Sequence, residues 1–299
     1  MAVDTEAHAE AFRSEGYVRF PRMFSAEEVR ALRETVQRIR ERERRSNSLQ
    51  TDPRFPKVVY IQGDLLAHRE LESVSYVLFE PRVLACARRL LGERLVYFGD
   101  SSLQLGEGAR GFHRDNVDRK DPAGPDWTGE YGVLRFGLYL QDHSRHSGGL
   151  KLRPRSHRQP NARGCGAVDV DIEPGDLLAW SLKMVHSGNN VRLRGFPRLC
   201  LHPRVERFVP SFLRVPEEAE RFAVFFTYGA PGLHVDRFMS FLGGREDYRE
   251  HWRRCYVNPS ILERARALGI EIRTSIAGYG DAHAETLGTA AGGARGAGA

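Results

Sequence analysis

The chain has 299 residues, of which 41% are hydrophobic and 28% charged, and it carries a formal net charge of +6. These proportions are typical of a globular protein and exclude wholesale disorder, while the positive balance permits an anionic ligand without requiring one. Four scattered cysteines without a Cys-x-x-Cys pair argue against a disulfide scaffold or a zinc cluster.

The N-terminus carries acidic residues, and no apolar stretch approaches the roughly 20 residues that span a bilayer. We therefore expect a cytoplasmic protein with no membrane partner. The arginines are scattered rather than gathered in a basic block, so we expect no nucleic-acid partner either. The sequence does not indicate an oligomeric state.

The first third of the chain is predicted to be helical. Ser25 followed by Glu28 forms a capping-box pattern. Apolar residues then recur at helical spacing, at Val29, Leu32, Val36 and Ile39. A second helix is expected from Pro81 to the C-cap residue Gly92.

From residue 94 onward the sequence becomes rich in β-branched and aromatic residues, with turns marked by glycine and proline. Short strands are expected at 95–105, 133–140, 150–152, 167–172, 177–180, 199–205 and 222–228. Because these strands do not alternate with helices, they favour an antiparallel sandwich or jelly roll.

We therefore expect one domain, mainly β with flanking helices. Its predicted parts are a helical region over 1–93, a β-core over 94–228, C-terminal helices over 229–275 within a domain that ends near 285, and a disordered tail over 286–299.

A His-x-Asp pair at His113 and Asp115 follows the first predicted strand of the core. Residues two apart on a strand point to the same face, so both side chains can bind one metal ion. His186 comes 73 residues later, after another predicted strand. Two histidines and one carboxylate leave coordination positions open, as in non-haem Fe(II) sites that use O2.

Arg198 comes 12 residues after His186. A guanidinium near the metal matches the carboxylate of a keto-acid co-substrate. Each of these residues alone is more often structural, and only their order and spacing together indicate a metal site.

Five segments of the chain resemble the phytanoyl-CoA dioxygenase (PhyH-like) family, over about residues 10 to 205. They are FRSEGYVRFPRMFSAEEVRALR, GFHRDN, GGLKLRPRSH, PGDLLAWSLKMVHSGNN and RGFPRL. The resemblance implies a double-stranded β-helix, a cupin-like jelly roll, with Fe(II), 2-oxoglutarate and O2 as reactants.

By this resemblance, His113, Asp115 and His186 are the iron ligands and the catalytic residues. Arg198 holds the distal carboxylate of 2-oxoglutarate, and Gln104 is a further contact to it. The implied activity is that of an oxidoreductase, a dioxygenase that releases succinate and CO2. Because Asp115 is retained, oxygenation is expected rather than halogenation.

The substrate is expected to be a small polar molecule, sugar-like or amino-bearing, as in natural-product or sugar-type biosynthesis. Candidate substrate residues are Arg135 and Tyr139, on one face of a strand, together with Asn116 and Trp127. The last two belong to the segment 116–130, which reads either as a lid over the site or as a surface excursion. A buried Arg135 would need an anionic partner.

Two other classes stay open. One is a metal- or sugar-binding β-barrel without oxygenase activity, such as an isomerase or binding module, which has no need for a guanidinium beside the metal. The other is a nucleic-acid demethylase, which needs a continuous basic groove with stacking aromatics.

Overall fold

Two N-terminal helices flank the first strand of the sheet. The computed structural model describes residues 5–46, 50–51, 58–61, 65–66, 71–106, 111–162, 164–218, 221–246, 248–249 and 259–273. In it, α1 spans Thr5–Glu15, β1 Tyr17–Phe20 and α2 Ala26–Ser46. The capping box is confirmed, since Ser25 N donates to Glu28 Oε2 (2.6 Å) and Glu28 N donates to Ser25 Oγ (3.2 Å).

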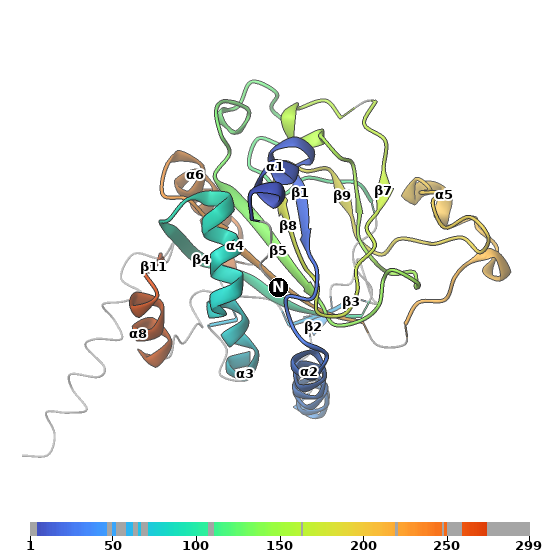
Figure 1. The fold of residues 1–299 in the computed structure, drawn as a ribbon, viewed down its shortest axis with the longest axis horizontal. Helices are drawn as coiled ribbons and strands as arrows, with labels where there is room; N and C mark the ends of the chain where they lie inside the picture. Colours follow the sequence, from blue (N-terminus) through green and yellow to red (C-terminus); the bar gives the residue numbers. More distant parts are fainter. Residues whose placement is uncertain are drawn as a thin grey trace, which may run out of the picture.

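A second helical group lies against the same face of the large sheet as α2 (Figure 1). It consists of α3 (Glu72–Ser75), a 3-10 turn (Tyr76–Phe79) and α4 (Pro81–Leu91). Gly92 ends α4 with a φ of 93°, a conformation that glycine adopts without steric cost. The helix predicted between Pro81 and Gly92 is thereby confirmed.

The core of the fold is an eight-stranded sheet in the order β1-β8-β5-β10-β4-β3-β2, with β11 paired to β4. All of its pairs are antiparallel except β11 with β4. The strands after β1 are β2 (Gln50–Thr51), β3 (Val58–Ile61), β4 (Leu95–Gly106), β5 (Val133–Tyr139), β8 (Leu177–Ser181), β10 (Phe222–Gly229) and β11 (Ile270–Ile272).

A smaller sheet, in the order β7-β6-β9, packs over one face of the large one. Its strands are β6 (Lys151–Leu152), β7 (Val168–Asp169) and β9 (His186–Ser187). Side chains from both sheets form a shared cluster that includes Tyr139, Leu152 and Trp180. The expected two-sheet jelly roll is confirmed as the fold class.

The strands of the large sheet alternate strictly between two environments. On β5, Leu134, Phe136 and Leu138 pack against the helices, whereas Tyr139 faces the small sheet. This alternation follows from the period of two along a strand. The face toward the small sheet is called the interior face below.

The C-terminal region adds α6 (Leu233–Gly243) and α8 (Pro259–Ala267). Helix α6 packs through Phe238 and Leu242 against Phe98 of β4. The N-terminal part of the chain is not purely helical, because β1 to β3 belong to the large sheet. The tail predicted over 286–299 lies outside the described residues.

The strand predicted over 199–205 is wrong. After β9 the chain makes an irregular excursion over the described residues 191–218, which includes the short helix α5 (Pro203–Glu206; Figure 1) and precedes β10. Glu206 accepts from the fully buried Lys151 Nζ of β6 and from Val191 N. These side-chain contacts attach the excursion to the small sheet, whereas the predicted strand would have been attached by main-chain hydrogen bonds.

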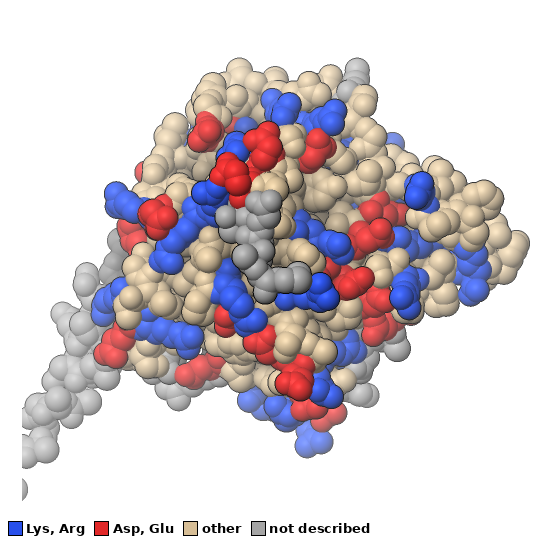
Figure 2. All heavy atoms as spheres, in the orientation of Figure 1, with Lys and Arg blue, Asp and Glu red and all other residues tan. Residues whose placement is uncertain are grey.

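Basic and acidic side chains are interspersed over the face drawn in Figure 2, as the scattered arginines of the sequence predict. Within the described ranges, none of the helices combines the length and the apolar composition needed to cross a bilayer.

Candidate metal centre and its cavity

A main-chain pairing brings the two predicted histidine ligands together. His113 N donates to His186 O (2.9 Å) and His186 N donates to His113 O (3.0 Å). The two imidazole ring centroids lie 4.2 Å apart. Because antiparallel partners project their side chains to the same face, the bridge places both rings on one side.

Asp115 completes the group two residues after His113. Its backbone N donates to Leu182 O (3.1 Å). Its Oδ1 lies 3.7 Å from His113 Nε2, and its Oδ2 lies 3.6 Å from His186 Nε2. The three potential ligand atoms lie within 4.8 Å of one another, so one metal ion can contact all three.

The inner ring nitrogens of both histidines are already engaged. His113 Nδ1 is 2.9 Å from Gly111 O, and His186 Nδ1 is 3.1 Å from Met184 O. A carbonyl accepts only from an N–H, so each neutral imidazole carries its proton on Nδ1 and presents the Nε2 lone pair toward Asp115. This donor set fits Fe(II), which takes two imidazoles and one carboxylate with positions left open.

The electrostatics keep the ligands in their metal-binding forms. Burial alone would raise the pKa of Asp115, but Arg135, His186 and His113 more than offset this and lower the pKa to about 2. Burial and the neighbouring His113 lower the pKa of His186 to about 4. At neutral pH the site therefore offers a carboxylate and a neutral imidazole.

Arg135 lies on the interior face of β5 and has the anionic partners that its burial requires. Its Nη2 is 2.8 Å from Asp100 Oδ2, and its Nη1 is 3.4 Å from Asp115 Oδ2. Asp100 also accepts from Thr227 Oγ1 (2.6 Å) and Tyr248 OH (2.9 Å). This network holds Arg135 against the carboxylate of Asp115.

Two buried polar atoms on the interior face have no hydrogen-bond partner among the described residues: Tyr139 OH and Trp180 Nε1. Trp180 lies 5.9 Å from the His186 ring, centroid to centroid. Gln104 is buried and pairs in register with Ala223, which packs in the same cluster as Tyr139 and Trp180. These residues therefore provide polar groups beside the metal ligands that fit a bound polar co-substrate.

Arg198 is not brought to this group. It is exposed, in a turn of the excursion, and does not line the cavity described below. Besides Arg135, a second guanidinium on the interior side is that of Arg221, which is 8% exposed and directly precedes β10. Its Nη1 donates to Gly106 O (3.1 Å), and its charge acts on the pKa of both Tyr139 and His143.

Arg221 is not among the residues predicted from the sequence, in which Arg198 was chosen for its place after His186. The available signal was the position of this arginine directly before the predicted strand 222–228, whose alternate residues face the interior.

The segment 116–130 is held together by its own hydrogen bonds. Asn116 Nδ2 and Asp118 N both donate to Asp126 Oδ2 (2.9 and 3.1 Å), and Asp126 N donates to Asp118 Oδ2 (2.8 Å). Trp127 lies between Arg114 and Lys183, at 5.0 and 5.3 Å from its ring. Neither Asn116 nor Trp127 lines the cavity, so in this structure both residues stabilise the segment itself.

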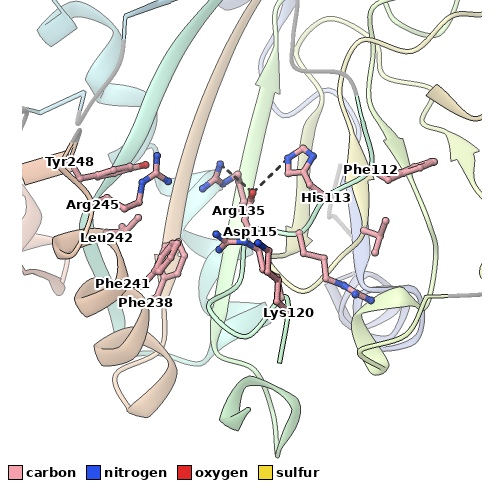
Figure 3. Close-up of a pocket in the computed structure, with 13 residues that line it drawn as sticks. Phe112, His113, Asp115, Lys120, Arg135, Phe238, Phe241, Leu242, Arg245 and Tyr248 are labelled. Carbon is pink, nitrogen blue, oxygen red and sulfur yellow. Dashed lines mark ion pairs between the residues drawn. The ribbon is translucent and has the colours of Figure 1, made fainter. Parts of the chain in front are cut away.

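A cavity of about 590 Å³ opens over the metal ligands. Figure 3 shows His113, Asp115 and Arg135 on one side of it, and Phe238, Phe241 and Tyr248 on the side of α6. Its full lining is Phe112, His113, Arg114, Asp115, Arg119, Lys120, Arg135, Val185, Phe238, Phe241, Leu242, Arg245 and Tyr248. The cavity is large enough for a small-molecule substrate.

Known structures share this fold. AviO1 from Streptomyces viridochromogenes Tue57 is 18% identical with a TM-score of 0.55, covering 78% of this chain and 97% of that one. HygX from Streptomyces hygroscopicus, solved with nickel and 2-oxoglutarate, is 19% identical with a TM-score of 0.55, covering 77% and 88%.

Among curated proteins, the ectoine dioxygenase of Stutzerimonas stutzeri (strain A1501) is 28% identical over 158 residues. That match covers 50% of this chain and 49% of the relative, so it spans about half the length of each. The family model of phytanoyl-CoA dioxygenase (PhyH) matches residues 12–196, which include all three candidate metal ligands and end just before Arg198. The chain therefore belongs to the phytanoyl-CoA dioxygenase family, as its sequence motifs predict.

Proposed function

We propose that the protein is an Fe(II)- and 2-oxoglutarate-dependent dioxygenase that oxidises a C–H bond of a small polar molecule and releases succinate and CO2. The observation that carries this proposal is the convergence of His113 Nε2, His186 Nε2 and the Asp115 carboxylate on one point beside a cavity. Bound iron would supply the activation of O2, coupled to decarboxylation of 2-oxoglutarate.

The protein's own contribution at the metal is to fix the ligands. The carbonyls of Gly111 and Met184 hold the two imidazoles in the Nδ1–H tautomer. Arg135 holds the Asp115 carboxylate ionised and limits its rotation. Such outer contacts orient the ligands and tune their affinity for metal.

For the co-substrate, we propose Arg221 as the anchor of the distal carboxylate, in place of Arg198. A buried guanidinium on the interior face matches a carboxylate through paired N–H groups. Tyr139 OH and Trp180 Nε1 are buried donors that such a dicarboxylate can satisfy. Gln104 remains a candidate contact on the same face.

The names of similar proteins support a small polar substrate. One relative is an ectoine dioxygenase. HygX has been solved with hygromycin B bound, and the epimerase SnoN with Fe3+, alpha ketoglutarate and nogalamycin RO. These support a role in natural-product chemistry, with the substrate of this chain still to be identified.

The test measures O2 uptake and succinate release with Fe(II) and 2-oxoglutarate. His113→Ala and Asp115→Ala should abolish both. Arg221→Gln should raise KM for 2-oxoglutarate at least about tenfold, because it removes a charge-assisted hydrogen bond to the distal carboxylate. Arg198→Gln is the matched control and should leave KM unchanged.

If the protein binds metal but shows no O2 uptake that depends on 2-oxoglutarate, the non-oxidative barrel is correct instead. If Arg198→Gln raises KM and Arg221→Gln does not, the assignment of the anchor is wrong while the activity stands.

A further inference from the structure

The cavity over the metal ligands is strongly basic. Among its described lining residues only Asp115 is acidic, and it belongs to the metal site. Five lining residues are basic: Arg114, Arg119, Lys120, Arg135 and Arg245. The 13 lining residues thus carry a net charge of +4, against +6 for all 299 residues of the chain, so positive charge is concentrated around the cavity.

Two of these basic groups, Arg114 and Arg135, are committed to contacts inside the protein. Arg114 donates to four main-chain carbonyls, those of Ser156, Gln159, Pro160 and Lys183. Arg135 is paired with Asp100 and Asp115. Neither group is available as a primary site for a ligand's charge.

The other three lie at the cavity mouth. Arg119 and Lys120 are exposed residues of the segment that follows the metal ligand Asp115, and Arg245 follows α6. Arg119 stacks over Phe241 (5.0 Å to the ring centroid) and Arg245 over Tyr248 (4.8 Å). Lys120 has no ion pair or hydrogen bond with any residue in the described ranges.

Two acidic residues of the same segment, Asp118 and Asp126, are turned into the segment and do not line the cavity. Asp118 is buried and pairs with Arg237 (2.7 Å). Asp126 is fully buried within the hydrogen-bond network of the segment, and Asp121 Oδ1 accepts from Ala123 N (3.0 Å). The exposed Asp121 and Glu130 do not line the cavity either, so Arg119 and Lys120 are the charged residues that this segment contributes to the described lining.

Opposite the metal ligands, α6 and Tyr248 provide an aromatic wall. Phe238, Phe241 and Tyr248 line that side of the cavity, and Arg245 extends from it (Figure 3). A cavity with one apolar wall and a basic mouth is suited to an amphiphilic anion rather than to a cation.

We propose that the substrate carries an oxyanionic group, a carboxylate or a phosphate, attached to a flat or apolar body. Arg119 and Lys120 receive the oxyanion at the mouth, Arg245 adds positive charge there, and the aromatic wall of Phe238 and Phe241 supports the body. This inference rests on the proposed function and specifies its substrate class. It disfavours the amino-bearing substrate considered from the sequence, because an ammonium group would lie among like charges.

The test uses four aromatic probes of similar size: phenyl phosphate, phenylacetate, 2-phenylethanol and 2-phenylethylamine. Binding is measured by calorimetry on enzyme loaded with Ni(II) and saturating 2-oxoglutarate, so that the probes do not compete for the co-substrate site. The two anions should bind at least about threefold more tightly than the alcohol, and the amine should bind most weakly. The tighter anion identifies the oxyanion as phosphate or carboxylate.

The double variant Arg119→Gln/Lys120→Gln should weaken binding of the anions and leave the alcohol unchanged. One exposed ion pair changes binding about 1.4- to 5-fold, so the pair should give about 2- to 25-fold. Arg145→Gln, which removes an exposed positive charge outside the cavity, is the matched control and should change nothing. Both cavity residues are exposed, so the double variant should keep the wild-type Tm.

Equal binding of the alcohol and the anions, or tighter binding of the amine, would overturn this inference. Failure of the protein to bind 2-oxoglutarate in the presence of metal would instead refute the proposed function, and the same titration reports that result separately.

Discussion

Arg135 contacts two carboxylates, Asp100 and Asp115, in the interior of the sheet and supplies positive charge to both. It contacts Asp100 at 2.8 Å and Asp115 at 3.4 Å, and its side chain is only 22% exposed. Arg135→Gln keeps a polar side chain but leaves both carboxylates without their counter-charge. Removing one partner of a buried ion pair typically costs about 3–5 kcal/mol.

The expected magnitude lies at the lower end of that range, because part of the guanidinium reaches solvent. The pKa of Asp115 supports the direction of this effect. Burial would raise it, but the neighbouring charges, Arg135 first among them, lower it from 3.8 to about 2. A lowered carboxyl pKa stabilises the fold above the unfolded-state pKa, and that stability is lost as pH falls toward 2. We therefore expect Arg135→Gln to lower the free energy of unfolding at pH 7 by about 3 kcal/mol.

The assay is urea unfolding of the metal-free protein, with Asp100→Asn/Arg135→Gln as the companion variant. The second change removes one unpaired carboxylate and should restore part of the loss. Adding Ni(II) should stabilise Arg135→Gln more than the wild type, because the ion replaces the missing positive charge beside Asp115. A loss below about 1 kcal/mol, or equal stabilisation of both proteins by Ni(II), would refute this account of the network.

Three further predictions concern stability. Burial, followed by the charge of Arg221, lowers the pKa of His143 to about 3. The stability of the fold with a neutral His143 is complete above pH 6.5 and is lost toward pH 3, so the unfolding free energy of the wild type should fall relative to that of His143→Asn by about 1.4 kcal/mol per pH unit below 6.5. Parallel pH profiles of the two proteins would contradict this. Gly124→Ala should destabilise the segment 116–130, since a Cβ would lie 2.1 Å from Asp118 Cγ; unchanged hydrogen exchange there would show that the contact relaxes. Ser25→Ala should cost about 1 kcal/mol in thermal unfolding by removing the cap of α2, and a Tm equal to that of the wild type would argue against it.

The sequence was informative where local periodicity determines the structure. The helices near Ser25 and Pro81 and most core strands follow from capping residues and from alternation of apolar side chains. The same alternation predicts that His113 and Asp115 share a face, and the structure places them so; for Arg135 it left open whether the polar face of its strand looks inward or to solvent, and the structure places it inward.

The position of an interior guanidinium other than Arg135 could not be predicted from the sequence, because it depends on tertiary contacts. The excursion over 191–218 is irregular, and it is held by the buried contact of Lys151 with Glu206. No period in the sequence specifies how many residues such a segment uses before it re-enters the sheet. Arg198 therefore has the expected order in the chain, whereas Arg221 has the interior position.

The pairing of residues 113 and 186 has a consequence for engineering. Both hydrogen bonds between them involve only backbone atoms, so the spacing of these two positions should survive replacement of either side chain. Cysteine or carboxylate ligands could be installed there, one at a time, on an unchanged framework. The protein thus offers a scaffold in which the identity of the bound metal can be varied independently of the architecture that presents it.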